Sequence, residues 1–393
     1  MRSGRDAPEC VPVAAVWPYF APSTCHGYEM IGIPFFAALV LSAQAAPAAR
    51  SEPLSPEELV ALADRRNAEI VALRRELDEL RAADSKTPRG ADRTPATPGS
   101  AEDLEIRVRN TLLSAAEARF EHRRVLLSAK VRSAFARYSA GRALRKLSED
   151  TAVASAEMLR LADERRAQGR ESSASIEHVR LALARSRQES AAIEQRLSQS
   201  LIELFVLVNT PANGSLVLKG ALPQRSIVVE PSDSLVARAL RDRADLRAAR
   251  SDYEAALDAQ SLAAKNPARP SSPAPRSRGH ASSPDQGESP EAVITSADIA
   301  VRSLQEAIRF DVALAEARVR NANAAVAASV NIDLALVAED RKLFLDAYRD
   351  GTMPLSQVLT ALRDAYEVRR QEVLALEDLA DADADLRRAV GDR

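Results

Sequence analysis

The side chains best placed to do chemistry are three aspartates near the C-terminal end. Asp381, Asp383 and Asp385 form a D-x-D-x-D pattern, which is how an EF-hand calcium loop begins. Such a loop needs glycine at its sixth position and glutamate at its twelfth, and these positions hold Leu386 and Asp392. We therefore interpret the three aspartates as the solvated face of a helix and predict no calcium site.

Other reactive residue types give no stronger candidate. His122 and His178 are each isolated, without a second histidine, cysteine or carboxylate at metal-ligand spacing. The sequence contains no phosphate-binding glycine loop, nucleophile elbow or zinc-protease motif. Cys10 and Cys25 both lie close to the N-terminus, so the remaining chain has no disulfide framework and no cysteine nucleophile. The sequence predicts that the protein is not an enzyme and needs no metal or cofactor.

The composition is typical of long helices. Aromatic residues make up 4% of the 393 positions, whereas charged residues make up 28% and interleave both signs. Interleaved charges suit exposed helix faces with ion pairs one turn apart. The net charge of −2 lacks the basic excess that nucleic-acid binding requires, so we expect no nucleic-acid partner.

Residues 1–49 are expected to form an N-terminal extension and a signal peptide. An apolar run begins at Met30, is too short to span a bilayer comfortably, and leads into small residues. Ala43, Gln44 and Ala45 fit a cleavage site, although the usual basic segment before the run is missing. The alternative is a buried or disordered segment. Export followed by cleavage would remove both cysteines and leave a chain that starts near Leu54.

The chain repeats one block of sequence, and this duplication predicts its architecture. The segment Leu59–Arg74 returns as Leu235–Arg250, and the sequence around Gly169 returns around Gly351. We therefore divide the chain into a first helical repeat at 50–230, with a linker at 84–100, and a second at 231–393, with a linker at 266–290. Both linkers are rich in proline, serine and glycine.

Each repeat is predicted to contain a short helix, a linker, a very long helix, a glycine turn and a long return helix. Proline and glycine are nearly absent between the turns. The predicted helices cover 55–83, 101–167, 170–209, 234–264, 296–349 and 354–391, and residues 215–230 could hold two small strands. The predicted fold class is all-α, with two tandem antiparallel hairpins and at most a minor strand element. A lone hairpin cannot bury its whole apolar stripe, so we expect the chain to oligomerise.

The two glycine turns are the candidate interaction sites. Equivalent glycines in both repeats predict equivalent hairpin tips, which are the parts of such a molecule freest to meet a partner. The predicted partner-binding residues are Gln168, Gly169, Arg170, Ser172, Asp350, Gly351, Thr352 and Leu355.

These repeated motifs resemble the TolC-type outer-membrane efflux family. Each repeat of that family opens with an N/R-x-E/D-L-x-A-A/L-R helix, matched here by Arg66–Arg74 and Arg243–Arg250. Each later carries Y-x-x-G and then L-x-x-x-l-G, matched well in the second repeat and loosely in the first. The second-repeat matches are Tyr348, Gly351, Val358, Leu359, Ala361, Leu386 and Gly391.

The resemblance implies a trimer whose hairpins form a periplasmic tunnel. Its tips would dock on a periplasmic adaptor protein, cargo would come from an inner-membrane pump, and no cofactor is expected. The protein would lie in the cell envelope, at the outer membrane or in the periplasm.

Two departures from the family pattern matter. Family members insert a pair of long membrane strands in each repeat, at the places where this chain has its proline-rich linkers, so we expect that it does not build an outer-membrane barrel unaided. Many members also carry an acidic gate residue past the tip glycine, where this chain has Ser175, His178, Gln357 and Thr360. The alternatives are therefore a periplasmic helical scaffold without membrane strands, and a coiled-coil structural protein.

Overall fold

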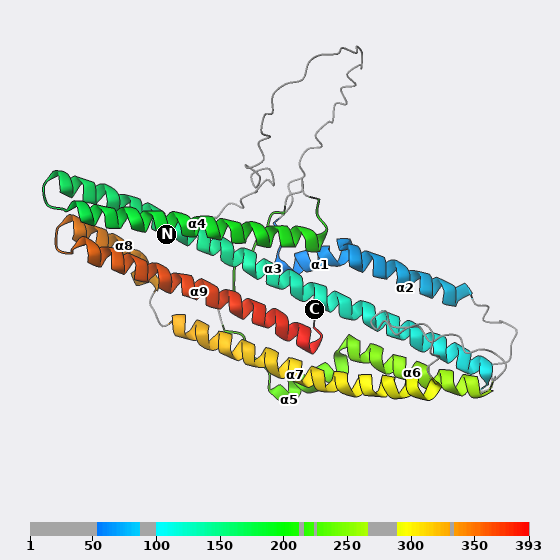
Figure 1. The fold of residues 1–393 in the computed structure, drawn as a ribbon. Helices are drawn as coiled ribbons and strands as arrows, with labels where there is room; N and C mark the ends of the chain where they lie inside the picture. Colours follow the sequence, from blue (N-terminus) through cyan, green and yellow to red (C-terminus); the bar gives the residue numbers. More distant parts are fainter. Residues whose placement is uncertain are drawn as a thin grey trace, which may run out of the picture.

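A computed structural model describes residues 53–86, 100–211, 216–223, 226–265, 289–330 and 334–392. The described part is an elongated, all-α molecule in which long helices lie side by side (Figure 1). The predicted signal region at 1–49 lies outside these residues. So do residues 87–99 and 266–288, on which the expectation about membrane strands rests.

The helices follow the order predicted for a duplicated unit. Within the described residues, the first repeat comprises α1 (Pro56–Arg66), α2 (Ala68–Lys86), α3 (Ala101–Ala167) and α4 (Ser173–Val208). The second comprises α5 (Ser232–Asp242), α6 (Ala244–Lys265), α7 (Pro290–Val330), α8 (Leu334–Arg349) and α9 (Leu355–Val390). The predicted all-α class of long antiparallel hairpins is confirmed.

Serine caps begin three of the first-repeat helices. The Ser55 hydroxyl accepts a hydrogen bond from the Glu58 amide, and the Glu58 carboxylate accepts one from the Ser55 amide, which together make a capping box. Ser100 and Ser172 cap α3 and α4 through their hydroxyls. α3 then continues for 67 residues, a length of roughly 100 Å at 1.5 Å per residue.

Two predicted helices are interrupted. The helix predicted over 55–83 breaks at Asn67, and that over 234–264 breaks at Arg243. The helix predicted over 296–349 is described as α7 and α8, and residues 331–333 between them lie outside the described part. Asn67 leaves the helical conformation with ψ at 129°, and its side-chain oxygen accepts hydrogen bonds from the Glu69 and Ile70 amides. This local bonding competes with the helical backbone, so a new helix starts directly after the break.

The strands predicted within 215–230 are not present in the described residues. Leu54 and Leu218 instead form a single parallel bridge, in which the Leu54 amide donates to the Val217 carbonyl at 2.8 Å and the Lys219 amide donates to the Leu54 carbonyl at 2.9 Å. These bonds therefore join the segment after α4 to the residues just before α1 without making a sheet.

The four longest helical paths form one layer. α3 lies between α4 and α9, and α9 in turn packs on α7 (Figure 1). α1 and α2 cover α3 from the first repeat, whereas α5 packs on α7 and α6 bridges α3 and α7. α4 and α7 are consequently the two edges of the layer, and each has a side that faces away from the rest of the chain.

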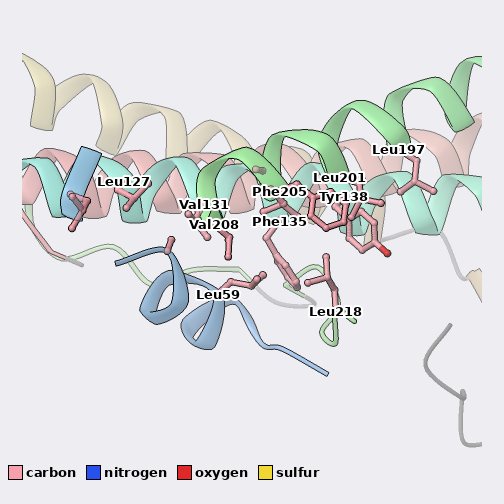
Figure 2. Packing of buried hydrophobic residues seen from close by; sticks show 14 residues of the cluster. Leu59, Leu127, Val131, Phe135, Tyr138, Leu197, Leu201, Phe205, Val208 and Leu218 are labelled. Atoms are coloured by element: carbon pink, nitrogen blue, oxygen red, sulfur yellow. The ribbon is translucent and has the colours of Figure 1, made fainter. Parts of the chain in front are cut away.

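Each repeat has a matching apolar core. Figure 2 shows the first, where Leu59 of α1 meets residues of α3 and α4 such as Val131, Phe135 and Val208. Leu235 of α5 meets α7 and α9 in the same way. The duplicated positions are equally buried, since Leu59 is 0% exposed and Leu235 is 2% exposed.

The helix breaks are also built twice at equivalent places. Asn67 donates from its side-chain amide to the Leu207 carbonyl near the end of α4, at 2.9 Å. Arg243 donates from its guanidinium to the Ala389 carbonyl near the end of α9, at 3.2 Å. Asn209 and Gly391 end those two helices in the left-handed conformation. Each break therefore satisfies a free carbonyl at the end of the return helix.

We predict that Leu59→Ala and Leu235→Ala each lower the free energy of unfolding by about 2–5 kcal/mol, because each leaves a cavity in a closed core. The control is Leu80→Ala, at a side chain that is 47% exposed, with an expected loss of about 0.5 kcal/mol or less. Urea denaturation of the three variants measures these changes. Equal losses for Leu59→Ala and Leu80→Ala would contradict the assignment of the first core.

Candidate interaction site

The two hairpin tips lie together at one end of the molecule (Figure 1). Gly169 and Gly351 have φ of 70° and 77°, in the left-handed region that glycine adopts without strain. The Arg170 amide donates to the Arg165 carbonyl at 2.9 Å, and the Thr352 amide donates to the Ala347 carbonyl at 2.9 Å. The prediction that both glycines build the same turn is confirmed.

Most of the predicted contact residues lie on the surface of the tips. Gln168, Gly169, Arg170, Ser172, Asp350, Gly351 and Thr352 are exposed. Ser172 is also engaged as the cap of α4, where its hydroxyl accepts from the Ser175 amide at 3.1 Å. Leu355 differs from the others because it is buried, with 4% of its surface exposed. It cannot present a contact surface in this conformation.

Leu355 instead belongs to an apolar cluster that joins the two tips. This cluster draws side chains from α3, α4, α8 and α9, and its buried members are Met158, Leu161, Ala162, Ile176, Val179, Tyr348, Leu355 and Val358. The tips are therefore packed against each other within one chain. A partner would meet both turns as one surface.

Polar contacts link the same two tips. Arg165 donates to the Tyr348 carbonyl at 2.7 Å, and its guanidinium lies 4.8 Å from the centre of the Tyr348 ring. The Tyr348 hydroxyl donates to a carboxylate oxygen of Glu171 at 2.9 Å. Sequence reasoning identified Tyr348 only as part of a motif and missed both partners. The first repeat has Arg166 at the place of the motif tyrosine, so the duplication gave no signal for this contact.

The contact between Tyr348 and Glu171 changes the pKa of both groups. Burial and the hydrogen bond to Glu171 raise the pKa of Tyr348. Burial of Glu171 opposes ionisation, but hydrogen bonds from Ser175 and Tyr348 outweigh it and lower the pKa of Glu171. A lowered folded-state pKa means that this stabilisation is complete above the ordinary glutamate pKa of about 4.3, and is lost as pH falls through the folded-state value.

The residues first considered for chemistry are placed in helices. His122 on α3 lies 3.9 Å from an Asp245 oxygen, in a shallow cleft beside α6, and burial lowers its pKa. His178 is exposed on α4. Among the residues that the structure describes, no three histidine, cysteine or carboxylate side chains are grouped to hold a metal ion.

The three C-terminal aspartates lie on α9, as predicted, but they do not share one solvated face. Asp383 pairs with Arg387 on the same helix, and Asp385 pairs with Arg318 of α7. Asp381 turns toward α3, where it bonds to Ser133 and one of its oxygens is fully buried. The prediction of a solvated position is wrong for Asp381, because α9 packs on α3 along that side.

Within the described part of the chain, no helix combines the length and the apolar character needed to cross a bilayer.

We predict that Tyr348→Phe loosens the tips while keeping the ring in its cluster. Loss of the hydrogen bond to Glu171 should lower the free energy of unfolding by about 1 kcal/mol and speed amide exchange over 165–175. Hydrogen exchange with mass spectrometry measures this effect. Glu177→Gln is the control, since Glu177 pairs with Arg180 on its own helix. Unchanged exchange in Tyr348→Phe would show that the contact does not hold the tips together.

Comparison with known proteins finds likeness in structure rather than in sequence. No protein-family model matches the chain, and no curated protein matches it either. The outer-membrane channel OprN superposes with a TM-score of 0.67 at 15% identity, over 94% of this chain and 99% of its own.

Two further solved structures agree. The outer-membrane protein VceC from Vibrio cholerae gives a TM-score of 0.63 at 14% identity, over 86% of this chain and 96% of its own. The open state of the MtrE outer-membrane channel from Neisseria gonorrhoeae gives a TM-score of 0.57 at 15% identity, over 86% of this chain and 89% of its own. At such identities the likeness shows the fold alone: the chain has the fold of the TolC-type outer-membrane channel protomers.

Proposed function

We propose that the protein is a component of an envelope efflux or export system, in which three copies form a helical conduit. The proposal includes export to the periplasm or outer membrane and docking of the paired tips on a periplasmic adaptor that serves an inner-membrane pump. One observation carries it: in the alignment of the two repeats, the two free edges of the layer correspond to faces that pack against other helices inside the chain.

The first free edge is an uncharged stripe on α4. It runs from Leu181 to Val206 at steps of three or four residues, so its members share one face. Every member is exposed, and Val206 is 70% exposed. The members are Leu181, Ala184, Gln188, Ala192, Gln195, Gln199, Ile202 and Val206.

The second free edge is a similar stripe on α7. Its members follow the same helical spacing and are all exposed, with Phe310 at 74% and Leu314 at 56%. Exposed apolar side chains in a continuous row are typical of surfaces that another molecule covers. The members are Ile299, Ser303, Ala307, Phe310, Leu314, Ala317, Asn321 and Ala324.

The duplication identifies what the α4 stripe corresponds to in the second repeat. When the two tip glycines are aligned, Gln195 and Gln199 of α4 match Glu377 and Asp381 of α9. Glu377 is 4% exposed, and Asp381 bonds to Ser133 of α3. The α9 face therefore packs inside the chain against the first repeat, whereas the equivalent α4 face has no cover among the described residues.

The α7 stripe corresponds in the same way to a buried face of α3. Alignment of the two cores matches Val131, Ala134 and Tyr138 of α3 with Val312, Ala315 and Val319 of α7. In that alignment Leu314 matches Ser133, which is the α3 residue that meets α9. Phe310, Ala317 and Asn321 match Ala129, Ala136 and Ala140, whose exposures are 8%, 3% and 0%.

These two matches favour one mode of association. α4 of one copy would lie on α7 of the next copy, as α9 lies on α3 within the chain. Such a contact is head-to-tail, so it closes into a ring when the rotation allows. Three copies would then supply six hairpins, which is the arrangement implied by the resemblance to the efflux family.

The tips and the comparisons support the remaining parts of the proposal. Both turns expose polar residues on one surface, which suits a contact with another protein. OprN and MtrE are described as outer-membrane channels. Their fold, together with the apolar N-terminal run, supports a place in the cell envelope for this chain.

The alignment predicts which residues meet across the subunit joint. The in-chain contact between Asp381 and Ser133 corresponds to a contact between Gln199 of one copy and Leu314 of the next. In a chain with both natural cysteines changed to serine, Gln199→Cys with Leu314→Cys should therefore form covalent dimers and trimers with a short bifunctional maleimide. Denaturing electrophoresis measures the products.

The matched control is Gln199→Cys with Arg309→Cys. Arg309 is exposed on a different face of α7, so this pair should stay monomeric under the same conditions. Equal cross-linking of both pairs, or none for Gln199 with Leu314, would argue against the ring.

Adaptor docking is tested separately, by capture of the trimer on a periplasmic adaptor and loss of capture when Arg170 and Asp350 are both changed to alanine.

A further inference from the structure

Two carboxyl groups lie in the joint between the two hairpins of one chain: Glu377 is buried and Asp381 is half-buried. Glu377 and Asp381 lie one turn apart on α9, so they share a face. The Glu377 carboxylate accepts a hydrogen bond from Arg196 of α4, and Asp381 bonds to Ser133 of α3. With 4% of its surface exposed, Glu377 is among the most buried charged residues of the described chain.

Each carboxyl group has one oxygen that lacks a partner. Among the described residues, none forms a hydrogen bond with Oε2 of Glu377 or with Oδ1 of Asp381, and both atoms are shielded from solvent. A buried, ionised oxygen without a partner is costly, whereas a neutral carboxyl group is much less so. The free oxygens are therefore places where a proton would relieve an unfavourable charge.

The surrounding charges only partly compensate for this burial. Arg196 of α4 faces Glu377, and Arg137 of α3 faces Asp381. Arg137 is shared, because it also pairs with Glu203 of α4 at 3.0 Å. On α9 itself, Asp378 adds negative charge near both groups and Asp385 adds it near Asp381. Burial is the largest influence on both groups, and it raises the pKa of Glu377 and of Asp381.

We propose that Glu377 and Asp381 form a proton-binding site that controls how tightly α9 packs on α3 and α4. Protonation removes the buried charge and tightens the joint between the hairpins. Ionisation weakens the joint. The equivalent face of α4 has Gln195 and Gln199, so the proton response belongs to the in-chain joint and not to the free edge. The site does not depend on self-association.

The sign of the effect follows from proton linkage. A carboxyl group with a raised pKa in the folded state binds more protons there than in the opened state. The joint is therefore most stable at low pH. It weakens as pH rises from the ordinary carboxyl value of about 4 through the raised value, by about tenfold in the opening equilibrium for each pKa unit of the increase.

Hydrogen exchange over α9 tests the proposal in the full chain. After correction for intrinsic exchange rates, protection over 372–386 should be greater at pH 5 than at pH 7.5. In the double variant Glu377→Gln with Asp381→Asn, protection should be the same at both pH values and equal to that of the natural chain at pH 5. Asparagine at 381 still accepts a hydrogen bond from Ser133, so the variant keeps that contact.

The control removes a charge elsewhere on the same helix. Asp364 is exposed on α9, so Asp364→Asn should keep the natural pH dependence. A second variant, Arg196→Gln, takes the cation away from Glu377 and should move the transition to higher pH.

Three outcomes would overturn the proposal. Protection in the natural chain could be independent of pH, or the double variant could keep the dependence. The double variant could also lose protection at both pH values while Arg196→Gln behaves in the same way. In that case the carboxylates would act as ion-pair partners and not as proton acceptors.

Discussion

The whole structure depends on how helices of this length cover their apolar sides. A single antiparallel pair leaves one side of each helix open, and the energy of burial favours any neighbour that can close it. Within the chain, the apolar sides of α3 are covered because α3 packs on α4 along one side and on α9 along another. α7 packs on α9, α5 and α6, and α4 packs mainly on α3, yet each helix keeps an exposed stripe that no described residue covers. Both edges of the layer therefore expose side chains that are left uncovered within the chain.

Equivalent contacts in the two repeats are made by different residue types. At the helix breaks, an amide of Asn67 in the first repeat and a guanidinium of Arg243 in the second satisfy equivalent carbonyls. Arg243 is 7% exposed and needs Asp245 and Asp311 to balance its charge. The equivalent faces of α4 and α9 also differ in residue type. Gln195 and Gln199 lie on the exposed edge, whereas Glu377 and Asp381 lie in the joint between the hairpins.

Sequence analysis predicted the features that depend on local pattern. The long helix over 101–167 and the two glycine turns follow from residue types that favour one backbone conformation. Leu59 and Leu235 were recognised only as repeated residues, and the structure places them at equivalent positions in the two cores.

The features that sequence analysis missed depend on contacts between distant segments. Leu355 was predicted to be a contact residue because it follows a turn, yet the second hairpin buries it against α3 and α4. Asp381 belonged to an exposed-looking pattern, and the packing of α9 on α3 places it in a joint. The link from Arg165 to Tyr348 joins positions far apart in the chain. Neither periodicity nor composition specifies such pairs before the helices are brought together.

The most direct test of the central claim is the assembly state of the purified protein. Native mass spectrometry gives the number of copies, and low-resolution electron microscopy of the same sample gives the shape. The account predicts three copies in a closed, hollow ring of six hairpins, with α4 of each copy beside α7 of the next. A monomer with both edges uncovered, or a solid bundle in which the two edges do not meet, would contradict it.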